Sequence, residues 1–182
     1  NYTRMPRWSP DGSKIIYGIG VLHTINPDGT DEKWFEAAGE GTLPEWSPDG
    51  SKIAFCSDRA GTGLDIYTIN LDGTGLTRIT NTPDYVEWCP RYSPDGTKLV
   101  CYSGNTTPQK QIAVMNADGT NRVLIGPDIA RRPNWTPDGT RILFASPIES
   151  GSTRHNLFTI NPDGTNLVNF TNANAHESNP SY

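Results

Sequence analysis

Residues 44–55 of the 182-residue chain read "PEWSPDGSKIAF", a pattern of short segments and a turn from which the architecture can be predicted. A short segment ends in an aromatic residue, and Ser-Pro-Asp-Gly follows it. Proline presets φ, the aspartate side chain can bond its own backbone, and glycine adopts the left-handed conformation, so these residues favour a tight turn. The next segment, residues 52–55, begins with Lys52 and continues with three apolar residues, so it is apolar on both faces, as expected of a strand between two neighbouring layers. The stretch therefore predicts a β-hairpin.

The same pattern occurs four times along the chain. The copies are "PRWSPDGSKIIY" (6–17), "PEWSPDGSKIAF" (44–55), "PRYSPDGTKLVC" (90–101) and "PNWTPDGTRILF" (133–144). Their turn aspartates, Asp11, Asp49, Asp95 and Asp138, follow one another at intervals of 38, 46 and 43 residues. This period is typical of propeller blades, each built from four strands.

A second motif follows each copy of the first. Its copies are "LHTINPDGT" (22–30), "IYTINLDGT" (66–74), "IAVMNADGT" (112–120) and "LFTINPDGT" (157–165). Each predicts a third strand that ends at asparagine and a turn into a fourth strand, with no helical period. We therefore expect an all-β protein: a β-propeller of four four-stranded antiparallel blades in a single domain over 1–182. The blades are predicted at 3–36, 43–80, 88–125 and 131–171.

The stretch "HESNPSY" at 176–182 resembles the beginning of a further repeat, because aligning Pro180 with Pro6 places Tyr182 at the position of Trp8. It predicts a surplus strand at 177–182. Three explanations are open: a slice of a longer propeller, closure of the chain's own ring, or addition of the strand to a neighbouring copy. The residues predicted for self-association are Ser178, Asn179, Pro180, Ser181, Tyr182, Met5, Pro6 and Trp8.

The motifs W-S-P-D-G-x-K-I and I-x-x-x-N-x-D-G-T resemble the WD40-like (PD40) repeat of the TolB β-propeller family, over essentially the whole chain. The resemblance implies an extracytoplasmic propeller, whether periplasmic, at the cell surface or secreted, that binds protein partners and performs no chemistry. Similar repeats also form non-catalytic lids of some serine peptidases and parts of large surface proteins. TolB-type propellers usually carry six blades and a separate domain, so the family's specific partners are not carried over to four repeats.

No catalytic, metal or cofactor site is predicted. In "NPDGTDE" (26–32), a calcium-loop register would place Thr24 first and Phe35 twelfth, and neither is a carboxylate. There is no G-x-S-x-G nucleophile motif and no C-x-x-C. The net charge of −5 argues against a broad nucleic-acid surface. No apolar run approaches the length of a membrane span, so we expect no membrane insertion.

Two cysteines allow alternative interpretations. If the turn at 94–96 is a three-residue loop, Cys89 lies opposite Cys101. A cross-strand disulfide would then form in an oxidising compartment and leave Cys56 as a thiol. The alternative is that Cys89 and Cys101 are two small buried thiols, because direct cross-strand neighbours often have poor disulfide geometry.

The turns with aspartate share one rim of the predicted propeller, and the loops that vary between repeats share the other. Variable loops on a rigid scaffold are where binding residues concentrate. The candidate binding residues on this variable rim are Asp58, Arg59, Tyr85, Lys110, Arg131 and Arg154.

The sequence thus predicts a non-catalytic interaction and self-assembly module whose partners are proteins, including copies of itself. One alternative is a structural subunit of an extracellular filament or tube built by head-to-tail strand donation. Another is a lid or accessory domain of a larger hydrolase or surface protein. A ligand-binding role for the central channel is a weaker alternative, on which the sequence is silent.

Overall fold

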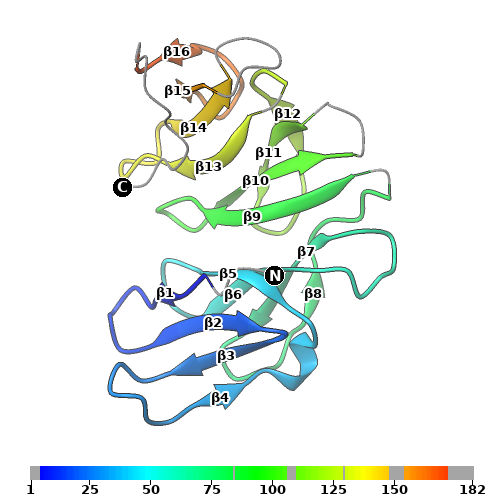
Figure 1. Cartoon of the computed structure of the whole chain (residues 1–182), viewed down its shortest axis with the longest axis vertical. Coiled ribbons are helices and arrows are strands. Elements are labelled where there is room, and N and C mark those ends of the chain that lie inside the picture. Colours follow the sequence, from blue (N-terminus) through cyan, green and yellow to red (C-terminus); the bar gives the residue numbers. More distant parts are fainter. Residues whose placement is uncertain (1–4, 84, 106–109, 129, 148–153, 172–182) are drawn as a thin grey trace. The chain divides into compact units, whose positions relative to one another are not determined.

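A computed structural model of the chain describes residues 5–83, 85–105, 110–128, 130–147 and 154–171. In this part of the chain, sixteen strands form four antiparallel sheets, and in each sheet the strands lie side by side in sequence order (Figure 1). The all-β prediction and the prediction of four four-stranded blades are confirmed. The predicted surplus strand at 177–182 lies outside the described residues.

Each sheet is one blade, numbered here in chain order. Blade 1 contains β1 (Arg7–Trp8), β2 (Ile15–Ile19), β3 (Val21–Ile25) and β4 (Lys33–Trp34), followed by a 3-10 turn, η1 (Glu36–Ala38). Blade 2 contains β5 (Thr42–Trp46), β6 (Lys52–Ser57), β7 (Asp65–Asn70) and β8 (Thr77–Arg78). Blade 3 contains β9 (Val86–Tyr92), β10 (Lys98–Gly104), β11 (Lys110–Asn116) and β12 (Val123–Ile125). Blade 4 contains β13 (Arg131–Trp135), β14 (Ile142–Pro147), β15 (His155–Ile160) and β16 (Val168–Asn169).

The chain divides into two compact units, Asn1–Tyr92 and Ser93–Tyr182. The first unit holds β1 to β9 and the second holds β10 to β16, so the boundary falls at the turn between the first two strands of blade 3. The assignment of all 182 residues to one domain remains a prediction.

In each unit the hydrophobic core lies between two successive blades. The core of the first unit joins Ile16 and Leu22 of blade 1, with Phe35 and Ala38, to Trp46, Ile53, Phe55, Tyr67 and Ile69 of blade 2. The core of the second unit joins Val100, Ile112, Val114 and Ile125 of blade 3 to Trp135, Ile142, Phe144 and Ile160 of blade 4. Alternate residues of a strand point to opposite faces, so each blade has one face for the blade before it and one for the blade after it.

A left-handed residue precedes the proline of three inner strands, a feature that the sequence analysis did not identify. Leu43, Cys89 and Arg132 have φ of 55°, 56° and 49°. At Leu43 and Arg132 the ladder to the next strand shifts register, between Thr42 and Glu45 and between Arg131 and Asn134. Such a shift is a β-bulge, which bends a strand and redirects the side chains beyond it.

Candidate functional site

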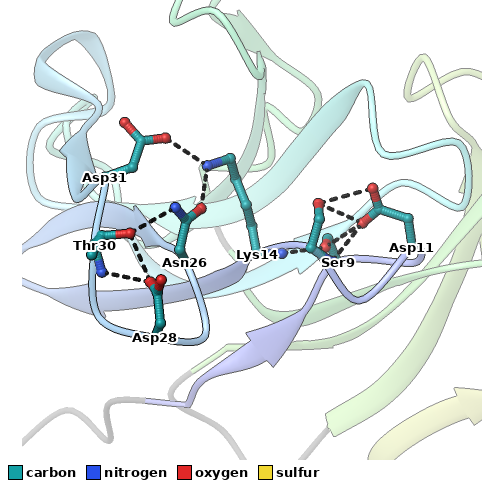
Figure 2. A network of polar contacts seen from close by, with 8 residues as sticks. Ser9, Asp11, Lys14, Asn26, Asp28, Thr30 and Asp31 are labelled. Atoms are coloured by element: carbon teal, nitrogen blue, oxygen red, sulfur yellow. Dashed lines mark hydrogen bonds and ion pairs between the residues drawn. The ribbon is translucent and has the colours of Figure 1, made fainter.

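The turn aspartates of blade 1 are bound within their own turns (Figure 2). Asp11 Oδ1 accepts hydrogen bonds from Ser9 Oγ at 2.6 Å and from the backbone N–H of Ser13 at 3.0 Å. Asp28 Oδ1 accepts from the Thr30 backbone N–H at 2.9 Å and from Thr30 Oγ1 at 2.7 Å. These bonds stabilise the carboxylate, and the Ser9 hydroxyl is the largest cause that lowers the pKa of Asp11 to about 2.

A cation links the two turns of each blade. In blade 1, Lys14 Nζ donates to Asn26 Oδ1 and to Asp31 Oδ2, both at 2.9 Å. The equivalent bonds in the other blades are Lys52 to Asn70 at 2.8 Å, Lys98 to Asn116 at 3.4 Å and Arg141 to Asn161 at 3.1 Å. The repeated Lys or Arg and the repeated Asn are therefore partners, and the polar residues of this rim hold the hairpins in register.

We expect the turns to make the fold sensitive to acid. The pKa is lowered in all eight turn aspartates: Asp11, Asp28, Asp49, Asp72, Asp95, Asp118, Asp138 and Asp163. A carboxyl whose folded pKa lies below its unfolded value, 3.8 for Asp11, stabilises the fold above that value. This stability is lost as the pH falls toward the folded pKa, about 2 for Asp11.

Thermal unfolding followed by circular dichroism should therefore show Tm falling steeply below a pH of about 4. The variant Asp11→Asn/Asp49→Asn should have a lower Tm at neutral pH and a shallower fall in acid, because two of the titrating groups are gone. If Tm falls equally with decreasing pH in the variant and in the original chain, the turn aspartates are not the cause of the acid sensitivity.

A half-buried charge cluster joins the three inner strands of the first unit. Glu45 Oε2 of β5 accepts from Arg7 Nε of β1 at 3.2 Å and from Arg91 Nη1 of β9 at 2.8 Å. All three residues follow the repeated proline. Burial raises the pKa of Glu45, and the two arginines act in the opposite direction. Trp46 Nε1 also donates to the Arg7 carbonyl at 3.2 Å, so side chains of β5 fix the position of β1.

The sequence analysis missed this cluster, although the repeat contains a signal for it. The position between proline and the aromatic residue reads Arg7, Glu45, Arg91 and Asn134 in the four copies. This position varies between the repeats, although the proline before it is constant and the residue after it is always aromatic. The residues of the first three copies alternate in charge.

The residues predicted for the variable rim fall into two sets, because Asp58, Arg59 and Tyr85 belong to the first unit and Lys110, Arg131 and Arg154 to the second. Asp58 is exposed in a loop, and Tyr85 is half-buried and donates its N–H to the Thr82 carbonyl. Lys110 begins β11, Arg131 is exposed at the start of β13, and Arg154 is exposed just before β15. Their role in binding remains a prediction.

Arg59 has a structural role. Its guanidinium lies 4.8 Å from the centroid of the Tyr67 ring and 5.6 Å from that of Phe55. Nη1 donates to the Ala37 carbonyl at 2.8 Å. The residue thus joins a loop of blade 2 to the 3-10 turn after blade 1, and these contacts engage the face of its guanidinium.

The Cys89–Cys101 disulfide is absent from the structure, in which all three cysteines are thiols. The prediction assumed a regular ladder, whereas Cys89 has a left-handed backbone at the inner-strand position before proline. The backbone N–H of Cys89 instead donates to the sulfur of Cys56, a residue of the same unit. Burial raises the pKa of the Cys56 thiol, so it is a weak nucleophile.

Aromatic residues are exposed on one face of blade 1. Trp8 and Trp34 are 60% and 67% exposed. Between their strands, the ring of His23 is stacked on Tyr17 with centroids 5.2 Å apart and meets Trp34 edge-on at 6.5 Å. Trp8 was predicted for self-association, together with Met5, which is half-buried, and Pro6, which is exposed. The other predicted members, Ser178, Asn179, Pro180, Ser181 and Tyr182, lie outside the described residues.

No helix among the described residues is both long and apolar enough to cross a membrane. No curated protein matches the chain in sequence.

Solved structures share the fold. A putative TolB from Agrobacterium tumefaciens matches with a TM-score of 0.78 and 21% identity, over 93% of this chain and 62% of that one. TolB from Acinetobacter baumannii matches with a TM-score of 0.73 and 22% identity, over 95% and 44%. The β-propeller domain of the Trilobed protease from Pyrococcus furiosus, described as having an open velcro topology, matches at 0.67 and 16%, over 93% and 57%.

The chain therefore spans about 62% and 44% of the two TolB structures that it resembles. The family model of the TolB β-propeller domain (PD40) matches residues 1–182, the whole chain. Together with the repeated turns and the four blades, this match shows that the chain belongs to the TolB β-propeller family.

Proposed function

We propose that this protein is a non-catalytic, extracytoplasmic propeller module that acts through protein–protein contacts and assembles with copies of itself. The observation that carries the proposal is the exposed aromatic face of blade 1, with Trp8 and Trp34 at its edges. A contiguous apolar surface of this kind marks interaction sites in soluble proteins, and tryptophan is enriched among the residues that dominate binding energy.

The physical basis is the free energy gained when these side chains leave water. Burial of a large apolar side chain stabilises a complex by about 1.5–3 kcal/mol before the costs of association. Tyr17 and His23 lie between the two tryptophans and are half-buried, so a partner that covers the face also covers them. Membership of the TolB family and similarity to TolB structures support a role in protein contacts.

Self-assembly is tested by the mass of the particles in solution. Light scattering and electron micrographs should show large or filamentous particles for residues 1–182 and monomers for a truncated chain of residues 1–175. This result would support donation of the last strand to a neighbouring copy. Monomers of equal stability in both preparations would refute self-assembly and leave binding to other proteins as the proposed role.

A second candidate is an accessory domain of a larger hydrolase. The similarity to the propeller domain of the Trilobed protease favours it. The test is to sequence the gene on both sides of the segment that encodes this chain. A hydrolase domain in the same reading frame would support the accessory role, and stop codons close to both ends would rule it out.

A further inference from the structure

Two cysteines of the first unit lie where blade 2 meets the strand that begins blade 3. Cys56 belongs to β6 and Cys89 to β9, and these two strands are in contact. Successive side chains of a strand point to opposite faces of its sheet. Phe55 lies in the core shared with blade 1, so the next residue, Cys56, points to the other face, where β9 lies. Cys56 is completely buried there.

The equivalent joint between blades 1 and 2 shows how closely this position approaches the next blade. Gly18 occupies the repeat position of Cys56, and Leu43 occupies that of Cys89. Leu43 and Cys89 have nearly the same left-handed backbone, with φ of 55° and 56°. A Cβ added to Gly18 would lie 3.6 Å from the Cα of Thr42, the residue before Leu43. A side chain at the position of Cys56 therefore meets the backbone next to the position of Cys89.

The two cysteines are in direct contact. The backbone N–H of Cys89 donates to the sulfur of Cys56. Burial is the largest cause that raises the pKa of the Cys56 thiol, and the neighbouring Cys89 thiol is the next. The amide nitrogen and the side chain of Cys89 are bonded to the same Cα, so the Cys89 thiol also lies close to the Cys56 sulfur.

The strand β9 is attached to blade 2 on both sides of Cys89. Glu87 donates its N–H to the carbonyl of Leu64, directly before β7, at 2.8 Å. Arg91 Nη1 donates to Glu45 Oε2 of β5, also at 2.8 Å. Cys89 lies midway between these two attachments, so the fold itself holds its side chain beside Cys56. Groups that are held together in this way react as if each were present at a very high concentration.

We propose that Cys56 and Cys89 are a redox pair, whose disulfide fastens the first strand of blade 3 to blade 2. This inference goes beyond the proposed function and does not depend on the partners of the protein. It also differs from the pairing predicted from the sequence, because Cys101 belongs to the second unit and lies opposite Ala113 in its sheet.

The oxidant is a small-molecule disulfide. Cys56 is the weaker nucleophile, so the Cys89 thiolate attacks first, forms a mixed disulfide with one half of the oxidant and releases the other half as a thiol. Cys56 then gives its proton to water, attacks the Cys89 sulfur and displaces the second thiol. The two protein thiols thus lose two electrons and two protons, and the oxidant is reduced to two thiols.

The pairing can be determined from the tryptic peptides of the full chain. Cleavage after lysine and arginine leaves each cysteine on a separate peptide: Cys56 on 53–59, Cys89 on 79–91 and Cys101 on 99–110. The chain is equilibrated with mixtures of reduced and oxidised glutathione at a pH of about 8, where thiolates form, and the remaining thiols are alkylated. We expect mass spectrometry to show 53–59 joined to 79–91, and 99–110 alkylated.

The disulfide should also stabilise the fold. Oxidation should raise Tm by about 5–10 °C, because the bond closes a loop that contains β7 and β8 and so restricts the unfolded chain. The Tm of Cys89→Ser should not respond to oxidised glutathione. Cys101→Ala is the matched control, because it keeps the pair and should show the same rise as the original chain. Circular dichroism under reducing conditions checks that both variants are folded.

Three results of the peptide analysis would overturn the proposal. A link between 79–91 and 99–110 would show that Cys89 pairs with Cys101 instead. Glutathione retained on Cys89 would show that Cys56 does not reach the mixed disulfide. Three alkylated cysteines in a large excess of oxidised glutathione would show that the fold does not bring the two thiols together. Each of these results is obtained without a partner protein, so failure of this proposal is distinguishable from failure of the proposed function.

Discussion

Replacement of Phe55 by alanine should lower the free energy of unfolding by about 3–5 kcal/mol, the usual cost of truncating a fully buried phenylalanine. Phe55 has no exposed surface and lies in the core between blades 1 and 2. Its ring is stacked on Tyr67 with centroids 6.0 Å apart. A Cβ added to Gly41 would lie 2.9 Å from Phe55 Cδ2, so the backbone already approaches the ring closely. The cavity would remain because the sheet on either side cannot collapse into it.

Urea unfolding measures this effect, with Trp8→Ala as the matched control. Trp8 is another large aromatic residue of the same unit, but it is 60% exposed, so its removal should change the stability by less than about 1 kcal/mol. A loss of less than about 1 kcal/mol for Phe55→Ala would mean that the joint between blades 1 and 2 is loosely packed.

The second large effect is expected for Glu45→Ala. Removal of one partner of a buried ion pair costs about 3–5 kcal/mol, and partial exposure of the Glu45 side chain reduces our expectation to about 2–3 kcal/mol. The variant leaves Arg7 and Arg91 facing each other without the carboxylate that both contact. Because Arg7 precedes Trp8 in β1, the inner strand should also loosen and self-association should weaken.

A triple variant separates charge from packing. In Glu45→Leu/Arg7→Met/Arg91→Met all charges of the cluster are replaced by apolar groups of similar size, and this exchange is often neutral or stabilising for buried clusters. We expect stability close to that of the original chain, measured by urea unfolding. Glu36→Ala, an exposed glutamate in η1, is the control for a lost surface charge. If Glu36→Ala and Glu45→Ala lower the free energy of unfolding equally, the charge cluster contributes no more to stability than an exposed charge does.

Local chemistry explains why most of the fold could be predicted. The turn around Asp11 is closed by Ser9 and Ser13, within two residues on either side, so a short stretch of sequence contains all its bonds. The strand positions were predictable for a similar reason, because Trp46 and Trp135 are buried at the same place in the repeat.

Features that depend on contacts between blades could not be predicted in this way. Glu45 meets Arg91 across 46 positions of the chain, and Arg59 meets Ala37 across 22. Nothing in the local sequence of Arg59 distinguishes it from a solvated loop residue. The left-handed backbone at Cys89 is a further example, because the local sequence does not distinguish this residue from an ordinary strand residue.

The closed turns have a consequence for the evolution of blade number. The aspartates, hydroxyls and asparagines of the turns find their partners inside the same repeat, so a duplicated gene segment would encode a unit whose turns are already closed. Recombination between repeats that share these motifs could then lengthen or shorten the array in single steps. Under this view, selection acts on the residues that contact neighbouring blades, such as Glu45. The hairpins themselves can be exchanged between repeats.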